Sequence, residues 1–130
     1  MRTCREPTFL PLTLSTARTA CATHGPAAQV VQATARRADS AAAECWAALL
    51  AGCDAPGRHQ LPTRLRELAA AAATYATDGN RGRIDEARCR IEEAVADRDG
   101  EDFAEAFIGY DQAIAAAIAR AHTRQESPTR

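Results

Sequence analysis

Residues 65–76, with the sequence LRELAAAAATYA, decide the fold of this chain. Five consecutive alanines follow two leucines, and alanine is the best helix former because it loses no side-chain entropy and buries no polar group. Apolar residues recur here at intervals of three or four, which places them on one face of a helix. They are Leu61, Leu65, Leu68, Ala72 and Tyr75. This pattern predicts an amphipathic helix over residues 62–77.

The same composition continues outside this segment, because alanine accounts for 32 of the 130 residues. Similar apolar spacing predicts further helices over residues 27–51, 84–97 and 101–122. Glycine, proline, aspartate and asparagine between these segments predict turns, and short connections favour antiparallel neighbours. We therefore expect an all-α fold, an up-and-down antiparallel bundle of about four helices.

Both ends of the chain differ from this bundle domain, which we place at residues 25–122. Residues 1–24 are rich in threonine, and Pro7 and Pro11 interrupt any helix there. This segment is expected to be an irregular N-terminal arm. Residues 123–130 are polar and are expected to form a flexible tail.

Large apolar side chains are few, since only 23 residues are Val, Ile, Leu, Met, Phe, Trp or Tyr. Long alanine faces on the first and last predicted helices would leave a shallow apolar surface on a monomer, and monomers rarely expose large apolar patches. We therefore expect the chain to form a homodimer. The expected contact lies on Ala113 to Ala121 or on Ala35 to Leu50.

Charge is balanced overall but unevenly distributed. All 16 basic residues are arginine and the formal net charge is −1, which excludes a general polycation for nucleic acid. Residues 1–66 carry eight arginines and four acidic residues, whereas residues 67–130 carry eight and thirteen. An alternative function is a DNA-associated regulator whose phosphate contacts surround the second predicted helix. The candidate residues are Arg58, Arg64, Arg66, Arg81 and Arg83.

The chemistry of catalysis and of metal binding is largely missing from the sequence. His24, His59 and His122 stand apart from the catalytic motifs E-x-x-H and H-E-x-x-H, and no phosphate-binding glycine loop is present. Residues 78–86 resemble part of a calcium-binding EF-hand loop, but the twelfth position, which should be a bidentate glutamate, is Cys89. We expect no enzymatic activity, no metal and no cofactor. A weaker alternative is a small-molecule pocket lined by Trp46, Tyr75 and Tyr110.

The five cysteines favour a reducing compartment, because their number is odd and they show no C-x-x-C spacing. We expect free thiols and a cytoplasmic location. No stretch approaches the roughly 20 apolar residues that span a bilayer. These observations favour a non-enzymatic helical module for protein–protein interaction or regulation that associates with itself.

Overall fold

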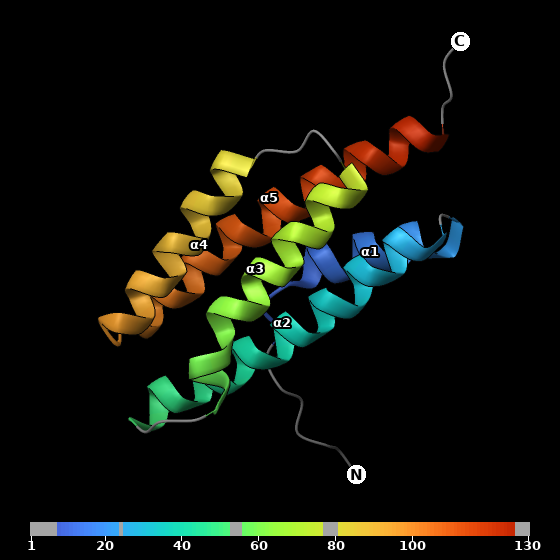
Figure 1. Ribbon diagram of the computed structural model, residues 1–130. Helices are drawn as coiled ribbons and strands as arrows, with labels where there is room; N and C mark the ends of the chain where they lie inside the picture. Colours follow the sequence, from blue (N-terminus) through green and yellow to red (C-terminus); the bar gives the residue numbers. More distant parts are fainter. Residues whose placement is uncertain (1–7, 24, 53–55, 77–80, 127–130) are drawn as a thin grey trace.

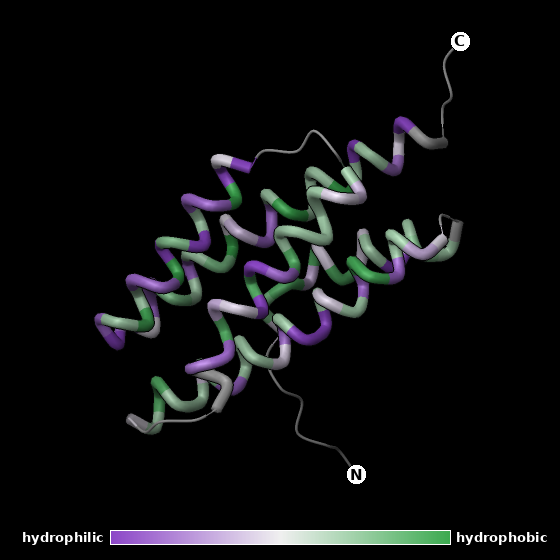
Figure 2. Tube along the Cα trace, viewed as in Figure 1, coloured by the Kyte–Doolittle hydropathy of each residue, from purple (hydrophilic) through white to green (hydrophobic). Residues whose placement is uncertain are grey.

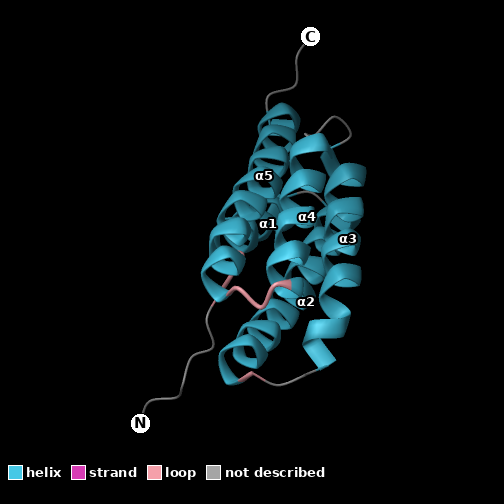
Figure 3. Ribbon diagram, turned by 90° about the vertical axis from the view of Figure 1, so that its left-hand side faces the viewer, coloured by secondary structure: helices cyan, strands magenta, loops and turns pink. Residues whose placement is uncertain are grey.

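A computed structural model describes residues 8–23, 25–52, 56–76 and 81–126, and these residues form five helices with no strand among them (Figure 3). The helices are α1 (Pro11–Thr23), α2 (Gly25–Ala51), α3 (Pro56–Ala76), α4 (Arg81–Ala96) and α5 (Gly100–Glu126). The all-α prediction is confirmed, but the expected number of four helices is wrong because α1 precedes them. Successive helices reverse direction (Figure 1), and α1 packs against both α2 and α5.

The expected irregular arm over residues 1–24 is wrong for residues 11–23, which form α1. Residues 1–7 and 24 lie outside the described part. Pro11 occupies the first helical position, where its missing N–H costs no hydrogen bond. Leu10 is the N-cap, since the N–H of Leu14 donates to its carbonyl at 2.9 Å. A leucine side chain accepts no hydrogen bond, so the first N–H groups of α1 need acceptors from elsewhere.

Two aspartates from other helices accept the N–H groups at and just before the start of α1, and we call this arrangement the aspartate clamp. Oδ1 of Asp39, on α2, accepts two backbone N–H groups at 2.7 and 3.0 Å. The carboxylate of Asp111, on α5, accepts the other two at 3.0 and 2.8 Å. The donors are the N–H groups of Phe9, Leu10, Leu12 and Thr13. Because negative charge is also favourable at a helix N-terminus, the clamp stabilises α1 between α2 and α5.

The alanine faces of α2 and α5 are covered within the chain. Ala35, Ala38 and Ala42 have no exposed surface, and Ala113 and Ala117 are each 2% exposed. These faces pack against α1 and against neighbouring helices in one continuous core. The expected dimer contact on Ala113 to Ala121 or Ala35 to Leu50 is therefore corrected, because most of that surface is already buried in a single copy.

Aromatic side chains fill one region of the core, near the start of α1 and the first half of α5. Phe103 is fully buried, and its ring centroid lies 5.5 Å from that of Phe9, 6.0 Å from that of Trp46 and 5.1 Å from that of Phe107. Tyr110 continues the cluster at 6.1 Å from Phe107. The Phe103–Trp46 pair is stacked and the others are tilted or edge-on, and such aromatic pairs are favourable in addition to the burial of their surface.

Two helix ends extend further than the sequence pattern predicts. Helix α3 begins at Pro56, and Pro62, the expected first residue, lies inside it. Pro62 cannot donate a helix hydrogen bond, and its neighbour Leu61 is buried in the core. Helix α5 continues past His122 to Glu126, so the expected flexible tail is wrong for residues 123–126. Arg124 donates to the Ala76 carbonyl at 3.1 Å, which ties this extension to the end of α3.

A tight turn joins α4 to α5, as the sequence predicts. Arg98 adopts a positive φ of 57°, and the N–H of Asp99 donates to the carbonyl of Ala94 at 2.9 Å, which ends α4 in a Schellman motif. Asp99 also begins α5, because its Oδ1 accepts the N–H of Asp102 at 3.0 Å. One residue thus ends one helix and caps the next, so the two helices pack closely side by side.

Tyr110 makes the stability of the fold depend on pH. Its buried hydroxyl donates to the Leu65 carbonyl on α3 at 2.7 Å. Burial raises the pKa of Tyr110, and nearby Arg88 lowers it by a smaller amount. Because the folded-state pKa lies above the unfolded value of about 10, stability is fully present below that pH and is lost as pH rises above it.

We expect Tyr110→Phe to lower the free energy of unfolding by about 1 kcal/mol at neutral pH, because the buried hydrogen bond is lost. The variant should also lose less stability than the wild type on moving from pH 8 to above the unfolded pKa of about 10. Urea unfolding of both proteins at the two pH values measures this difference, and Tyr75, present in both, cancels. If the wild type and Tyr110→Phe lost the same free energy of unfolding at the alkaline pH, the pKa of Tyr110 would not be raised in the folded protein.

Candidate interaction surface

The second half of α3 has an inner face of large apolar side chains and an outer face of small ones. Leu65, Leu68 and Tyr75 are buried, whereas Ala70 and Thr74 are exposed and Ala73 is half-buried. Figure 2 shows this half of α3 in pale green, after a first half with several purple segments. The Thr74 hydroxyl donates to the Ala70 carbonyl at 3.1 Å, so it already has an acceptor.

Two grooves flank this outer face, and Ala70 lines both of them. The groove on the α4 side has a volume of about 510 Å³, and the groove on the α2 side about 330 Å³. The first is lined by Ala69, Ala70, Ala72, Ala73, Arg81, Gly82, Ile84, Asp85 and Ala117. The second is lined by Ala27, Val30, Glu67, Ala70, Ala71 and Thr74. We call Ala69, Ala70, Ala73 and Thr74 with these two grooves the α3 face.

Charged side chains stand at the rims of the α3 face. Glu67 lines the α2-side groove and accepts a hydrogen bond from Arg64 at 3.2 Å, one turn earlier on the same helix. Arg81 and Asp85 line the α4-side groove. Arg81 is exposed and forms no ion pair with another residue in the described part of the chain.

Asp85, in contrast, is already paired within the chain. Arg88 donates to Asp85 at 2.6 Å and to Glu92 at 2.8 Å, and its own side chain is only 14% exposed. The hydrogen bond to Asp85, with the contribution of Glu92, raises the pKa of Arg88 although burial lowers it. The guanidinium therefore stays charged and pairs with both carboxylates, whereas Arg81 at the same rim has no ion-pair partner among the described residues.

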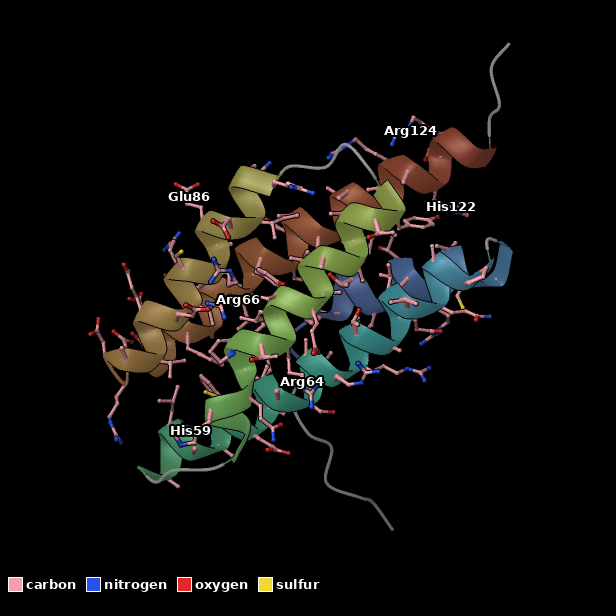
Figure 4. All side chains as sticks on the ribbon, in the orientation of Figure 1. His59, Arg64, Arg66, Glu86, His122 and Arg124 are labelled. Carbon is pink, nitrogen blue, oxygen red and sulfur yellow. The ribbon has the colours of Figure 1, made fainter. Side chains whose placement is uncertain are left out.

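The four arginines proposed for DNA whose side chains the structure describes do not form one continuous face. Figure 4 places Arg64 on the α2 side of α3 and Arg66 on its α4 side, as expected for residues about 200° apart around a helix. Each lies near a carboxylate: Arg64 is 3.2 Å from Glu67, and Arg66 is 4.0 Å from Glu92. Arg81 and Arg83 stand at the start of α4, and the side chain of Arg58 lies outside the described part.

A basic groove that was not expected from the sequence lies between α2 and α3. Arg36 and Arg37 from α2 and Arg64 from α3 line it together with Glu44, and its volume is about 260 Å³. The adjacent Arg36 and Arg37 were the part of this basic groove that could be seen in the sequence. Their position opposite Arg64 depends on how α2 and α3 pack.

The aromatic residues proposed for a pocket lie in two separate places, with Tyr75 and Tyr110 buried and Trp46 partly buried against the core. Trp46 and Tyr110 belong to the aromatic cluster, where each contacts a different phenylalanine. Tyr75 is buried ten residues along α3 from Leu65, the acceptor of the Tyr110 hydroxyl, which corresponds to about 15 Å of helix. None of the three lines a groove described above. The structure therefore does not bring them together around one cavity.

Among the described residues, the histidines and cysteines are not brought together in an arrangement typical of a catalytic site. His59 and His122 lie at opposite ends of the bundle (Figure 4), and His24 is outside the described part. Cys21 and Cys89 are free thiols, and Cys45 is buried in the core; Cys4 and Cys53 are not described. Among the described residues, no group of three histidine, cysteine or acidic side chains is arranged to hold a metal ion.

Comparison with known proteins leaves the α3 face to be interpreted from its own geometry. No family model, curated protein or solved structure matches the chain. Within the described residues, no helix combines the length and the apolar character needed to cross a membrane.

Proposed function

We propose that this chain is a non-enzymatic helical interaction module and that it self-associates through the α3 face. The observation that carries the proposal is the outer surface of α3, where small side chains lie between two grooves. Helices pack by placing ridges of side chains into grooves, and small residues at the contact allow a short interaxial distance. The α3 face offers both features to a second helix.

The position of this face in the fold supports the same proposal. The other long alanine surfaces, on α2 and α5, are covered by helices of the same chain. The α3 face remains open, and Val30 on its α2 side is 52% exposed. A second copy would cover this surface, and twofold dimers are the commonest closed assembly. We keep the expected cytoplasmic location as part of the proposal, based on the cysteine pattern.

The DNA-associated and small-molecule alternatives remain untested predictions. The first requires a continuous basic stripe, whereas Arg64 and Arg66 lie on different sides of α3 (Figure 4). The second was based on three aromatic residues that pack in or against the core and line none of the described grooves. Self-association is the function that the described surface favours over both.

Sedimentation equilibrium at micromolar concentrations tests the proposal. We expect a mass near twice the 13.9 kDa of one chain. Ala70→Glu places a charge at the centre of the α3 face, at an exposed position where the monomer tolerates it, and should weaken the dimer about 100-fold or more because two charges are buried per dimer.

Ala119→Glu is the matched control, because Ala119 is exposed on α5 and lines neither groove of the α3 face. This control should dimerise like the wild type. A wild-type mass of 13.9 kDa at every concentration would refute self-association. A dimer that tolerates Ala70→Glu would place the contact elsewhere.

A further inference from the structure

Two opposite charges lie at diagonal corners of the α3 face. Glu67 stands on the α2 side, near the beginning of the face, since it precedes Ala70 by one turn. Arg81, the first residue of α4, stands on the α4 side, where it lines the groove with Ala69, Ala70, Ala72 and Ala73, all of which follow Glu67 along α3. Ala70 lines both grooves and therefore lies between the two corners.

A twofold axis through the middle of this face would superimpose each corner on the other. Rotation by 180° about an axis perpendicular to the face reverses both the direction along α3 and the side on which a residue lies. An isologous contact needs such a self-complementary surface, because the same patch must fit its own copy. Here the rotation places Glu67 of each copy over Arg81 of the other copy, so opposite charges meet at both corners.

We infer that two copies pack α3 against α3 in antiparallel orientation, with Glu67 of each copy paired to Arg81 of the other. This inference rests on the proposed function, because it specifies the register of that self-association. In this arrangement, each groove is filled by side chains from the α3 face of a second copy of this chain.

Competition from charges within the chain is weak at both corners. Arg81 is exposed, and its neighbour Asp85 is held by Arg88 at 2.6 Å. Glu67 contacts Arg64 through a pair whose side chains are 31% and 41% exposed. Exposed pairs of this kind contribute little to stability, so Glu67 can turn to a partner at small cost.

A charge exchange tests the register. Glu67→Arg should place two like charges at each corner of the dimer, and Arg81→Glu should do the same with the opposite sign. We expect each single variant to raise the dissociation constant about tenfold, from two altered ion pairs per dimer. The double variant Glu67→Arg/Arg81→Glu restores opposite charges and should return to within about threefold of the wild type.

The control pair is Glu86→Arg and Arg83→Glu, since both residues are exposed on α4 and neither lines a groove of the α3 face. Both controls should leave the dissociation constant unchanged, and 0.5 M salt should reduce the effects of the single exchanges. If the wild type dimerises but the single exchanges have no effect, or the double exchange does not restore binding, the register is wrong while self-association stands. A monomeric wild type instead overturns the proposed function itself.

Discussion

Asp111→Ala is expected to lower the free energy of unfolding by about 3–5 kcal/mol, because the N–H groups of Leu12 and Thr13 lose their acceptor. Asp111 is 3% exposed, and its two carboxylate oxygens accept these groups at 3.0 and 2.8 Å. Water cannot readily replace the carboxylate beside Thr13, which has no exposed surface, so the Thr13 N–H would remain buried without a partner, and the less buried Leu12 N–H would lose its charged acceptor. The loss is a large fraction of the roughly 5–15 kcal/mol that stabilises a typical domain.

Urea unfolding followed by circular dichroism measures this loss, with Gln112→Ala as the control at the exposed neighbouring position. Asp111→Asn keeps one carbonyl oxygen, and we expect an intermediate loss, which provides a folded variant if the alanine variant does not fold. Amide exchange at Leu14, whose N–H donates to the Leu10 carbonyl, should accelerate in Asp111→Asn as α1 opens. A loss below about 1 kcal/mol for Asp111→Ala would mean that the clamp does not hold α1.

Phe103→Ala is expected to cost about 3–5 kcal/mol, the usual range for removing a buried phenylalanine. Phe103 has no exposed surface and contacts the rings of Phe9, Trp46 and Phe107. With so many alanines in the core, few large side chains can move into the cavity. The remaining cavity should therefore stay open and the full cost should appear.

Thermal unfolding of Phe103→Ala and Phe103→Leu, compared with Ile108→Ala on the same helix, tests this expectation. Ile108 is 58% exposed, so its truncation should cost less than about 1 kcal/mol. Phe103→Leu should be intermediate, because it keeps most of the apolar volume. Similar losses for Phe103→Ala and Ile108→Ala would show that the aromatic cluster is not a main source of stability.

Local sequence signals were sufficient for the helical class and for several helix ends. The alanine runs favour helix through intrinsic propensity, and the structure is helical in each of the four predicted segments. Gly52, with a φ of 71°, follows the end of α2 as the glycine and proline pattern indicates. At the Asp99-Gly100 turn, the Asp99 side chain likewise accepts the N–H of Asp102, three residues later. All of these effects act within a few residues along the chain, so they can be read without knowing the fold.

The candidate surface could be predicted only in part. The alanine run at residues 69–73 was evident, but helical periodicity alone did not show which alanines would remain exposed. The faces on α2 and α5 seemed equally open, and they are buried because α1 and other helices cover them. Arg64 and Arg66 seemed to belong to one basic surface, yet they lie on different sides of α3 (Figure 4).

By itself, the sequence determined that this chain is helical and where most of its turns fall, because propensity, periodicity and capping are local. Only the tertiary structure decided that residues 11–23 form a helix. Asp111 accepts the first N–H groups of α1 and Asp39 accepts those of Phe9 and Leu10 just before it, and the bond from Thr13 to Asp111 spans 98 residues of sequence. That distant contact places α1 over the alanine faces of α2 and α5. It thereby leaves α3, rather than the faces expected from the sequence, with its alanines open to a partner.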